Sequence, residues 1–159
     1  MKLLRKIKKT GGFTLIELLV VIAIIGVLSS VVLASLGTAR GKGANAAIKG
    51  NLNNLRGQME LFYDSNGSSY GSYTVANCPS AATSPATTGL HDAPAVNMLE
   101  SARAAAGAYA KCKAAGSYWW VSSPLKAQEG SNLYWCVDST GNVTGKQLQP
   151  ADGYTSCTS

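Results

Sequence analysis

A long uncharged stretch near the N-terminus constrains this chain more than any other feature. No charged residue occurs from Leu18 through Ala39, and the part ending at Leu36 is rich in leucine, valine and isoleucine. A bilayer-spanning helix needs roughly 20 apolar residues, so this stretch is long enough to cross a membrane. Positively charged flanks stay in the cytoplasm, so the chain after Arg40 is expected on the exported side. The basic residues that precede the stretch are Lys2, Arg5, Lys6, Lys8 and Lys9.

The junction between the basic segment and the apolar stretch holds one carboxylate. It consists of Gly12-Phe13-Thr14-Leu15-Ile16-Glu17. An ionised carboxylate at the edge of hydrocarbon is costly unless a counter-charge pairs with it. If the chain were cut before Phe13, the new amine would lie about one helical turn from Glu17, and the amine of one subunit could meet the carboxylate of the next. Alternatively, Glu17 is solvated among lipid headgroups and has no role.

These six residues resemble the prepilin motif of type IV pilins and of the related type II secretion pseudopilins. The resemblance implies that a membrane prepilin peptidase cuts between Gly12 and Phe13 and then methylates the amine of Phe13, and that Glu17 acts in assembly. It also implies a leader peptide at 1–12, a transmembrane and filament-core helix at 13–39, and an exported head at 40–159.

The same resemblance implies the partners and the location of the chain. The partners are further copies of the chain in a helical filament, an inner-membrane assembly platform and an assembly ATPase. The subunit is expected in the cytoplasmic membrane, with its head exported, before assembly, and in a cell-surface filament afterwards.

An ordinary secretory signal peptide is the second interpretation of the N-terminus. Val32-Leu33-Ala34 offers small residues for cleavage. The apolar region of a signal peptide is, however, about 7 to 15 residues long. The uncharged stretch here is longer and has an acid at its start, so the prepilin interpretation is preferred. A mature chain that starts at Ser35 would contradict it.

An amphipathic helix is expected to continue the apolar stretch. Apolar residues recur at spacings of four, three, four and three, which predicts one buried helix face. Glycines at 37, 41 and 43 each lower helix propensity by about 1 kcal/mol, so we expect a flexible joint at 37–43. Many relatives carry a proline near the place of Ala34, which this chain lacks. Asn66-Gly67 favours a turn and should end the helix. The residues of the buried face are Ile48, Leu52, Leu55, Met59 and Phe62.

The remainder predicts a small head of mixed structure. Residues 70–93 are expected to form a loop, Pro94 to begin a short helix, and Gly107 to end it. Aromatic and β-branched runs predict antiparallel strands at 118–121, 133–137 and 143–148. The fold class is therefore α+β, with a long N-terminal helix, half transmembrane and half amphipathic, packed on a small disulfide-bonded antiparallel sheet.

Two details of the predicted sheet concern its faces. Leu133, Trp135 and Val137 alternate along one strand, so they share a face that should cover the helix. Trp119 and Trp120 are adjacent and must point to opposite faces. One of them therefore needs cover from a loop or from a neighbouring subunit.

The four cysteines all lie in the exported part and lack C-x-x-C spacing, which favours disulfides over a zinc site. Three pairings are open. Cys78 with Cys112 is favoured because it would staple the loop to the segment before the first predicted strand. Cys136 with Cys157 would tie the tail to the sheet, and this pair also resembles the C-terminal disulfide loop of many pilins.

Charge and motifs argue against several function classes. The formal net charge is +6, but five of the basic residues lie in the leader, so the mature chain would carry about +1. A nucleic-acid partner is therefore not favoured. His91, the only histidine, is expected to be solvated, and no paired carboxylates, phosphate loop or nucleophile motif occurs. We expect no enzyme activity, no cofactor and no metal.

The expected function is that of a structural subunit of a type IV pilus-like surface filament. A type II secretion pseudopilin, or a minor pilin acting in DNA uptake or adhesion, remains the alternative. A membrane-tethered enzyme is the least supported class.

Overall fold

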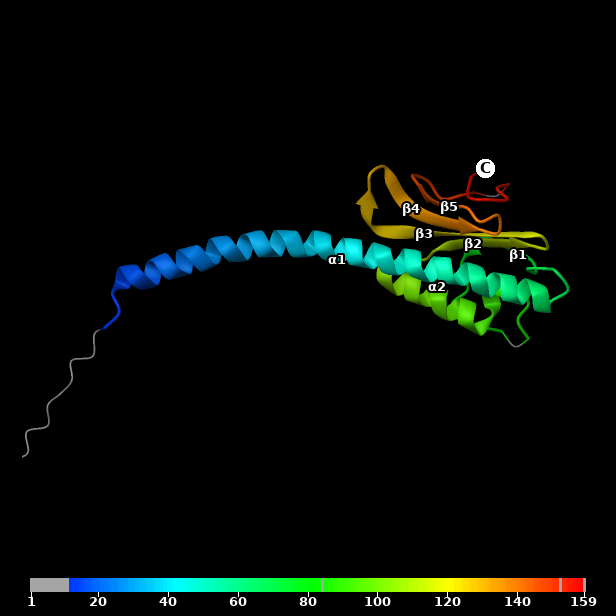
Figure 1. The fold of residues 1–159 in the computed structure, drawn as a ribbon, viewed down its shortest axis with the longest axis horizontal. Helices are drawn as coiled ribbons and strands as arrows, with labels where there is room; N and C mark the ends of the chain where they lie inside the picture. Colours follow the sequence, from blue (N-terminus) through cyan, green and yellow to red (C-terminus); the bar gives the residue numbers. More distant parts are fainter. Residues whose placement is uncertain (1–11, 84, 152, 159) are drawn as a thin grey trace, which may run out of the picture. The chain divides into compact units, whose positions relative to one another are not determined.

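The computed structural model describes residues 12–83, 85–151 and 153–158, so the basic part of the leader lies outside the described residues. Contacts divide the chain into two compact units, Met1–Gly37 and Thr38–Ser159, and each is described by itself. The elements are α1 (Leu15–Ser65), β1 (Tyr73–Asn77), the 3-10 helix η1 (Gly89–His91), α2 (Ala93–Ala106), β2 (Lys111–Ala115), β3 (Tyr118–Glu129), β4 (Asn132–Asp138) and β5 (Val143–Lys146). Figure 1 labels the two α-helices and the five strands.

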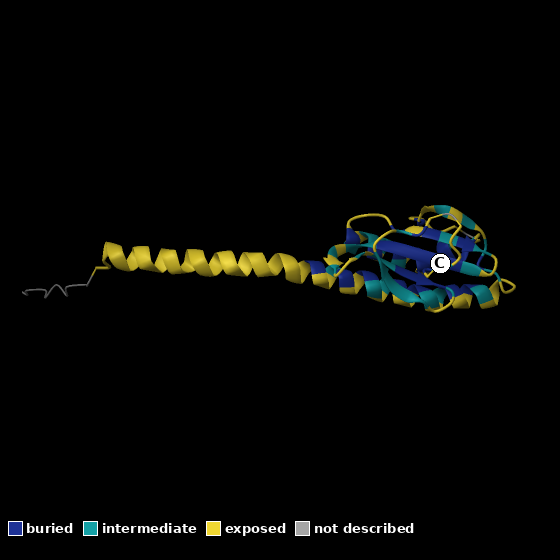
Figure 2. Cartoon of the chain, turned by 90° about the horizontal axis from the view of Figure 1, so that it is seen from above, coloured by how far each residue is buried: buried dark blue, intermediate teal, exposed yellow. Residues whose placement is uncertain are grey.

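The first unit contains the apolar part of α1. Every described residue from Gly12 to Gly37 is exposed, as the uniform colour of this part of α1 in Figure 2 shows. Three serines interrupt the apolar surface, and the hydroxyls of two of them, Ser30 and Ser35, donate to carbonyls of the same helix. Ser30 Oγ lies 2.8 Å from the Val27 oxygen and Ser35 Oγ 3.0 Å from the Val32 oxygen. Such internal pairing is what hydrocarbon requires, and α1 is long and apolar enough to cross a membrane.

α1 continues through all three glycines of the predicted joint at 37–43, so the helix is not interrupted there. The flexibility of the joint stays a prediction. The surroundings of the three glycines differ. A Cβ at Gly41 would lie 2.8 Å from the Cβ of Ala127, whereas a Cβ at Gly37 or Gly43 would meet nothing within 4 Å. Gly41 therefore allows β3 to approach α1 closely. The predicted stop is confirmed, since α1 ends at Ser65 and Gly67 has a positive φ of 64°.

The core of the second unit lies between the two helices and one face of the sheet. The predicted stripe of α1 is buried, with Ile48, Leu52, Leu55 and Met59 fully so. They form one cluster with residues of α2 and of the sheet. Because strands alternate their side chains, only every second sheet residue contributes. The cluster includes Leu99 and Ala102 of α2 and Trp119, Val121 and Val137 of the sheet.

The sheet has five antiparallel strands in the order β1-β2-β3-β4-β5. The three predicted strands correspond to β3, β4 and β5, and the short helix after Pro94 is α2, which Gly107 ends with a φ of 76°. The loop prediction for 70–93 is wrong at β1 and η1, and β2 was also missed. Both missed strands have five residues, and the charged and small residues of β2 have little intrinsic strand preference. Pairing with β3 stabilises β2, and β2 in turn pairs with β1.

The other face of the sheet is covered by the C-terminal tail. Trp119 and Trp120 lie in different clusters, as predicted, and Trp120 packs with Cys136 and Cys157. Its indole nitrogen donates to the Tyr154 carbonyl at 3.1 Å. A loop therefore covers this tryptophan, and no neighbouring subunit is needed. Leu133 departs from its prediction, being 46 % exposed, because it lies near the β3–β4 turn outside the core cluster.

The two disulfides have the pairing that the sequence favoured. Cys78 is joined to Cys112 with a Cα–Cα distance of 5.0 Å, and Cys136 to Cys157 with 5.8 Å. The first connects the segment after β1 to β2. The second holds the tail over the sheet.

Candidate processing and assembly site

Gly12 and Phe13 precede α1 and lie open to solvent. Phe13 is 90 % exposed, and a Cβ at Gly12 would meet nothing within 4 Å. The peptide bond between them is therefore not covered by any described part of the chain. Packing against the described residues does not demand a glycine at position 12.

Glu17 lies in the first turn of α1 and forms a reciprocal cap with Thr14. Its Oε2 accepts hydrogen bonds from the Thr14 amide and the Thr14 hydroxyl, each at 2.8 Å. The Glu17 amide donates to the Thr14 hydroxyl oxygen at 3.2 Å. This is a capping box, which satisfies amide groups that the first turn of a helix leaves without partners. Glu17 and Thr14 therefore stabilise the first turn of α1, the helix that carries the apolar stretch.

Thr14 is the residue of this site that the sequence prediction missed. A threonine followed three residues later by glutamate, just before an apolar run, is the sequence pattern of a capping box. The prediction concerned only the charge of Glu17 and its counter-charge on another subunit. The structure brings Thr14 and Glu17 together and leaves Phe13 exposed.

Asn45 is a second residue whose role was missed. It is fully buried, its Oδ1 accepts from the amides of Lys126 and Ala127, and its Nδ2 donates to the Ala127 oxygen at 2.6 Å and to Glu129. Gly41 and Asn45 continue the spacing of the apolar stripe toward the N-terminus, so a buried position was readable from the sequence.

An ion pair lies next to Asn45. Lys49 forms a hydrogen bond and ion pair with Glu129, and its ammonium lies 4.2 Å from the centre of the Trp135 ring. The hydrogen bonds from Lys49 and Asn45 hold the pKa of the Glu129 carboxyl below its usual range. Together these contacts fix α1 to the β3–β4 hairpin.

Asp138, at the end of β4, accepts hydrogen bonds from the β4–β5 turn and from the C-terminal tail. The carboxylate is 1 % exposed. Burial by itself raises its pKa, but hydrogen bonds from the Cys157 amide, from Thr140 and from the Asn142 amide outweigh burial and hold the pKa below its usual value. The Cys157 amide is 2.6 Å from Oδ2. One carboxylate thus fixes both the β4–β5 turn and the disulfide-bonded tail.

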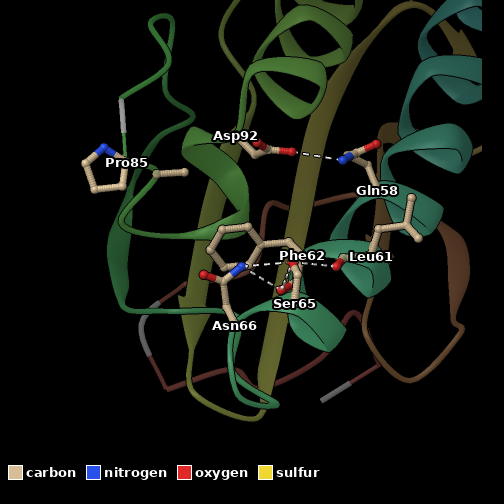
Figure 3. A pocket seen from close by; sticks show the side chains of 8 residues that line it. Gln58, Leu61, Phe62, Ser65, Asn66, Pro85 and Asp92 are labelled. Atoms are coloured by element: carbon tan, nitrogen blue, oxygen red, sulfur yellow. Dashed lines mark hydrogen bonds between the residues drawn. The ribbon is translucent and has the colours of Figure 1, made fainter.

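A hollow of about 330 Å³ lies at the C-terminal end of α1. Figure 3 shows Asp92 accepting a hydrogen bond from Gln58, and Asn66 bonded to Phe62 and Ser65. The polar side chains that line this hollow are therefore largely hydrogen-bonded within its wall. Its lining residues are Gln58, Leu61, Phe62, Ser65, Asn66, Pro85, Ala86 and Asp92.

His91 departs from the expectation of a solvated side chain. It is half-buried, with Nδ1 3.0 Å from the Thr88 hydroxyl and its ring edge-on to Tyr73. In the described part of the chain, no group of three or more His, Cys, Asp or Glu side chains is arranged to hold a metal ion.

The comparisons with known proteins agree with the N-terminal site. The family model of the prokaryotic N-terminal methylation motif matches residues 7–33. No curated protein and no solved structure matches the chain. The match covers Gly12, Phe13, Thr14 and Glu17 together with much of the apolar stretch. The chain thus carries a prokaryotic N-terminal methylation motif on a long apolar helix, followed by an α+β head, which is consistent with the type IV pilin and pseudopilin family.

Proposed function

We propose that this chain is a structural subunit of a type IV pilus-like surface filament. A prepilin peptidase cuts between Gly12 and Phe13 and methylates the Phe13 amine, and the mature subunit waits in the cytoplasmic membrane with its head exported. The assembly platform and its ATPase then move it into the filament. The protein is not an enzyme, and its work is mechanical.

The observation that carries the proposal is the exposed apolar surface of α1 beginning directly at the methylation motif. The large apolar side chains from Leu15 to Leu36 are 45 % or more exposed in the described structure. In a membrane these side chains face lipid. In a filament they face the same helices of other subunits, and the transfer costs little because both surroundings are apolar.

The charge of Glu17 gives the filament its register. An unpaired carboxylate among apolar helices is costly, so each subunit added must bring a counter-charge to the Glu17 of a neighbour. The methylated amine of Phe13 remains basic and serves as that counter-charge. A contact of this head-to-tail kind, repeated by a rotation that does not close, gives an open fibre.

The test is mass spectrometry of the mature N-terminus together with electron microscopy of sheared cell-surface material. We expect a chain beginning with methylated Phe13, and this protein as a component of fibres. Fibres that lack the protein, in cells whose protein secretion fails on its deletion, would favour a pseudopilin instead. A chain that begins at Ser35 would exclude both.

A further inference from the structure

We propose that Arg40 and Lys42 bind the phosphates of anionic phospholipids in the exported-side leaflet while the subunit waits in the membrane. This inference rests on the proposed function, because it requires the apolar part of α1 to span a bilayer. The partner is a lipid surface rather than another protein.

The position of the two residues along α1 determines their depth. The uncharged stretch from Leu18 to Ala39 extends about 33 Å as an α-helix. The hydrocarbon core of a bilayer is about 30 Å thick, and about 40 to 45 Å with its headgroups. With Glu17 at one edge of the hydrocarbon, Arg40 emerges among the opposite headgroups, and Lys42 follows about 3 Å further along the helix. Their long side chains can place the charged ends at the phosphates.

Neither residue has a partner within the described part of the protein. Both side chains are exposed, and neither takes part in an ion pair there. The Glu129 carboxylate takes its hydrogen bonds from Lys49 and Asn45, and Lys42 acts on it only through its charge, as the smallest of the effects on its pKa. Two cations at headgroup depth are therefore left without a counter-ion from the described residues.

The neighbouring basic residues are engaged differently. Lys49 is bound between Glu129 and the Trp135 ring. The Lys126 ammonium lies 3.1 Å from the place that a Cβ at Gly107 would take, beside the C-terminal end of α2, whose carbonyls attract cations. The head therefore uses Lys49 and Lys126 internally and leaves Arg40 and Lys42 for an external anion. At their depth in a membrane, the anion present is the lipid phosphate.

The test compares three full-length proteins reconstituted into vesicles of phosphatidylcholine and phosphatidylglycerol. They are the unaltered chain, the double variant Arg40→Gln/Lys42→Gln and the control Lys111→Gln/Lys146→Gln, which loses the same charge elsewhere in the head. Electron spin resonance of trace spin-labelled phosphatidylglycerol or phosphatidylcholine gives the preference of each protein for the anionic lipid. The basic leader is present in all three, so its contacts cancel in the comparison.

The double variant should lose anionic-lipid preference by several-fold at low ionic strength, up to about five-fold for each charge removed, while the control keeps it. Equal preference in all three proteins, or an equal fall in both variants, would overturn the proposal. Unchanged lipid preference combined with fewer cross-linked multimers of the double variant would assign the two residues to a second copy of the chain, and would also overturn it. Vesicle flotation separates this inference from the proposed function, because protein that does not float contradicts the spanning helix itself.

Discussion

In the proposed filament, Glu17 would have two tasks, because it caps α1 and would also pair with the amine of a neighbouring subunit. Oε2 accepts both hydrogen bonds from Thr14, and in the described part of the chain Oε1 accepts none. The cap therefore leaves one oxygen for the amine of a neighbouring subunit. Capping depends on an acceptor oxygen, whereas pairing with the amine depends on the charge, so the two tasks can be separated by substitution.

Glu17→Gln keeps an acceptor at the third helical position and removes the charge, whereas Glu17→Ala removes both. If the charge gives the register, both variants should lose surface filaments to a similar extent, measured as protein recovered by shearing. Normal fibres with glutamine and none with alanine would show instead that the cap alone matters.

Asn45 is the residue on which the attachment of α1 to the β3–β4 hairpin depends most. Asn45→Ala would leave the Lys126 and Ala127 amides and the Ala127 carbonyl without their partner, and should lower the free energy of unfolding by about 2 to 4 kcal/mol. Urea unfolding of the full chain in detergent micelles measures this. The control Asn51→Ala removes only a bond to Ala47 within the exposed helix surface and should change stability by less than about 0.5 kcal/mol.

At the scale of elements, the glycines of α1 differ in what surrounds them. Gly41→Ala would place a methyl group against Ala127 and should cost about 1 to 3 kcal/mol, because the hairpin must move away. Gly43→Ala meets open space and should stabilise the helix by nearly 1 kcal/mol. Thermal unfolding of both variants tests whether the melting temperature falls for Gly41→Ala and rises for Gly43→Ala. Two stabilised variants would mean that β3 does not lie against α1 at this point.

The turn after β4 makes the stability of the head depend on pH. Asp138 has a lowered pKa in the folded chain, so its contribution is present above the ordinary value of 3.8 and is lost as the pH falls through the folded value. Asp138→Asn should lower the free energy of unfolding at pH 7 by about 2 kcal/mol, since an amide nitrogen would face amide donors. It should also flatten the loss of stability below about pH 4.

Urea unfolding at pH 7 and at pH 3 gives both quantities. Asp64→Asn is the matched control, because Asp64 is exposed at the end of α1 and should alter neither. If Asp138→Asn lost as much stability between pH 7 and pH 3 as the unaltered chain, other carboxylates would be responsible for the pH dependence.

At the scale of the whole molecule, the two units differ in what covers their apolar surface. The core of Thr38–Ser159 is closed by two helices, the tail and two disulfides, whereas the first unit is exposed throughout its described residues. A fragment from Thr38 to Ser159 should therefore be a soluble monomer with both disulfides formed, and the full chain should need detergent or lipid. Size-exclusion chromatography with light scattering measures this, and an aggregating fragment would contradict the division.

The parts of the fold that were predicted are those with a strong local signal. A short window of sequence is enough to predict each of them. They are the stripe from Ile48 to Phe62, the turn at Gly67, the helix after Pro94 and the aromatic strands. β2 was missed because its charged and small residues give no such signal, and β1 because it is only five residues long. β2 is stabilised by pairing with β3, and β1 by pairing with β2. The capping box of Thr14 and Glu17 is also a local pattern, but the prediction for Glu17 rested on its charge and did not include the cap.

The sequence by itself determined the apolar helix, its start at an N-terminal methylation motif and the α+β character of the head, because these follow from hydrophobic periodicity and from residues adjacent in the chain. Only the tertiary structure decided what Gly41, Asn45 and Asp138 do. Each of these residues acts on a partner far away in sequence, namely Ala127, the end of β3 and Cys157. Which distant groups meet depends on the packing of the whole core, which no local pattern encodes.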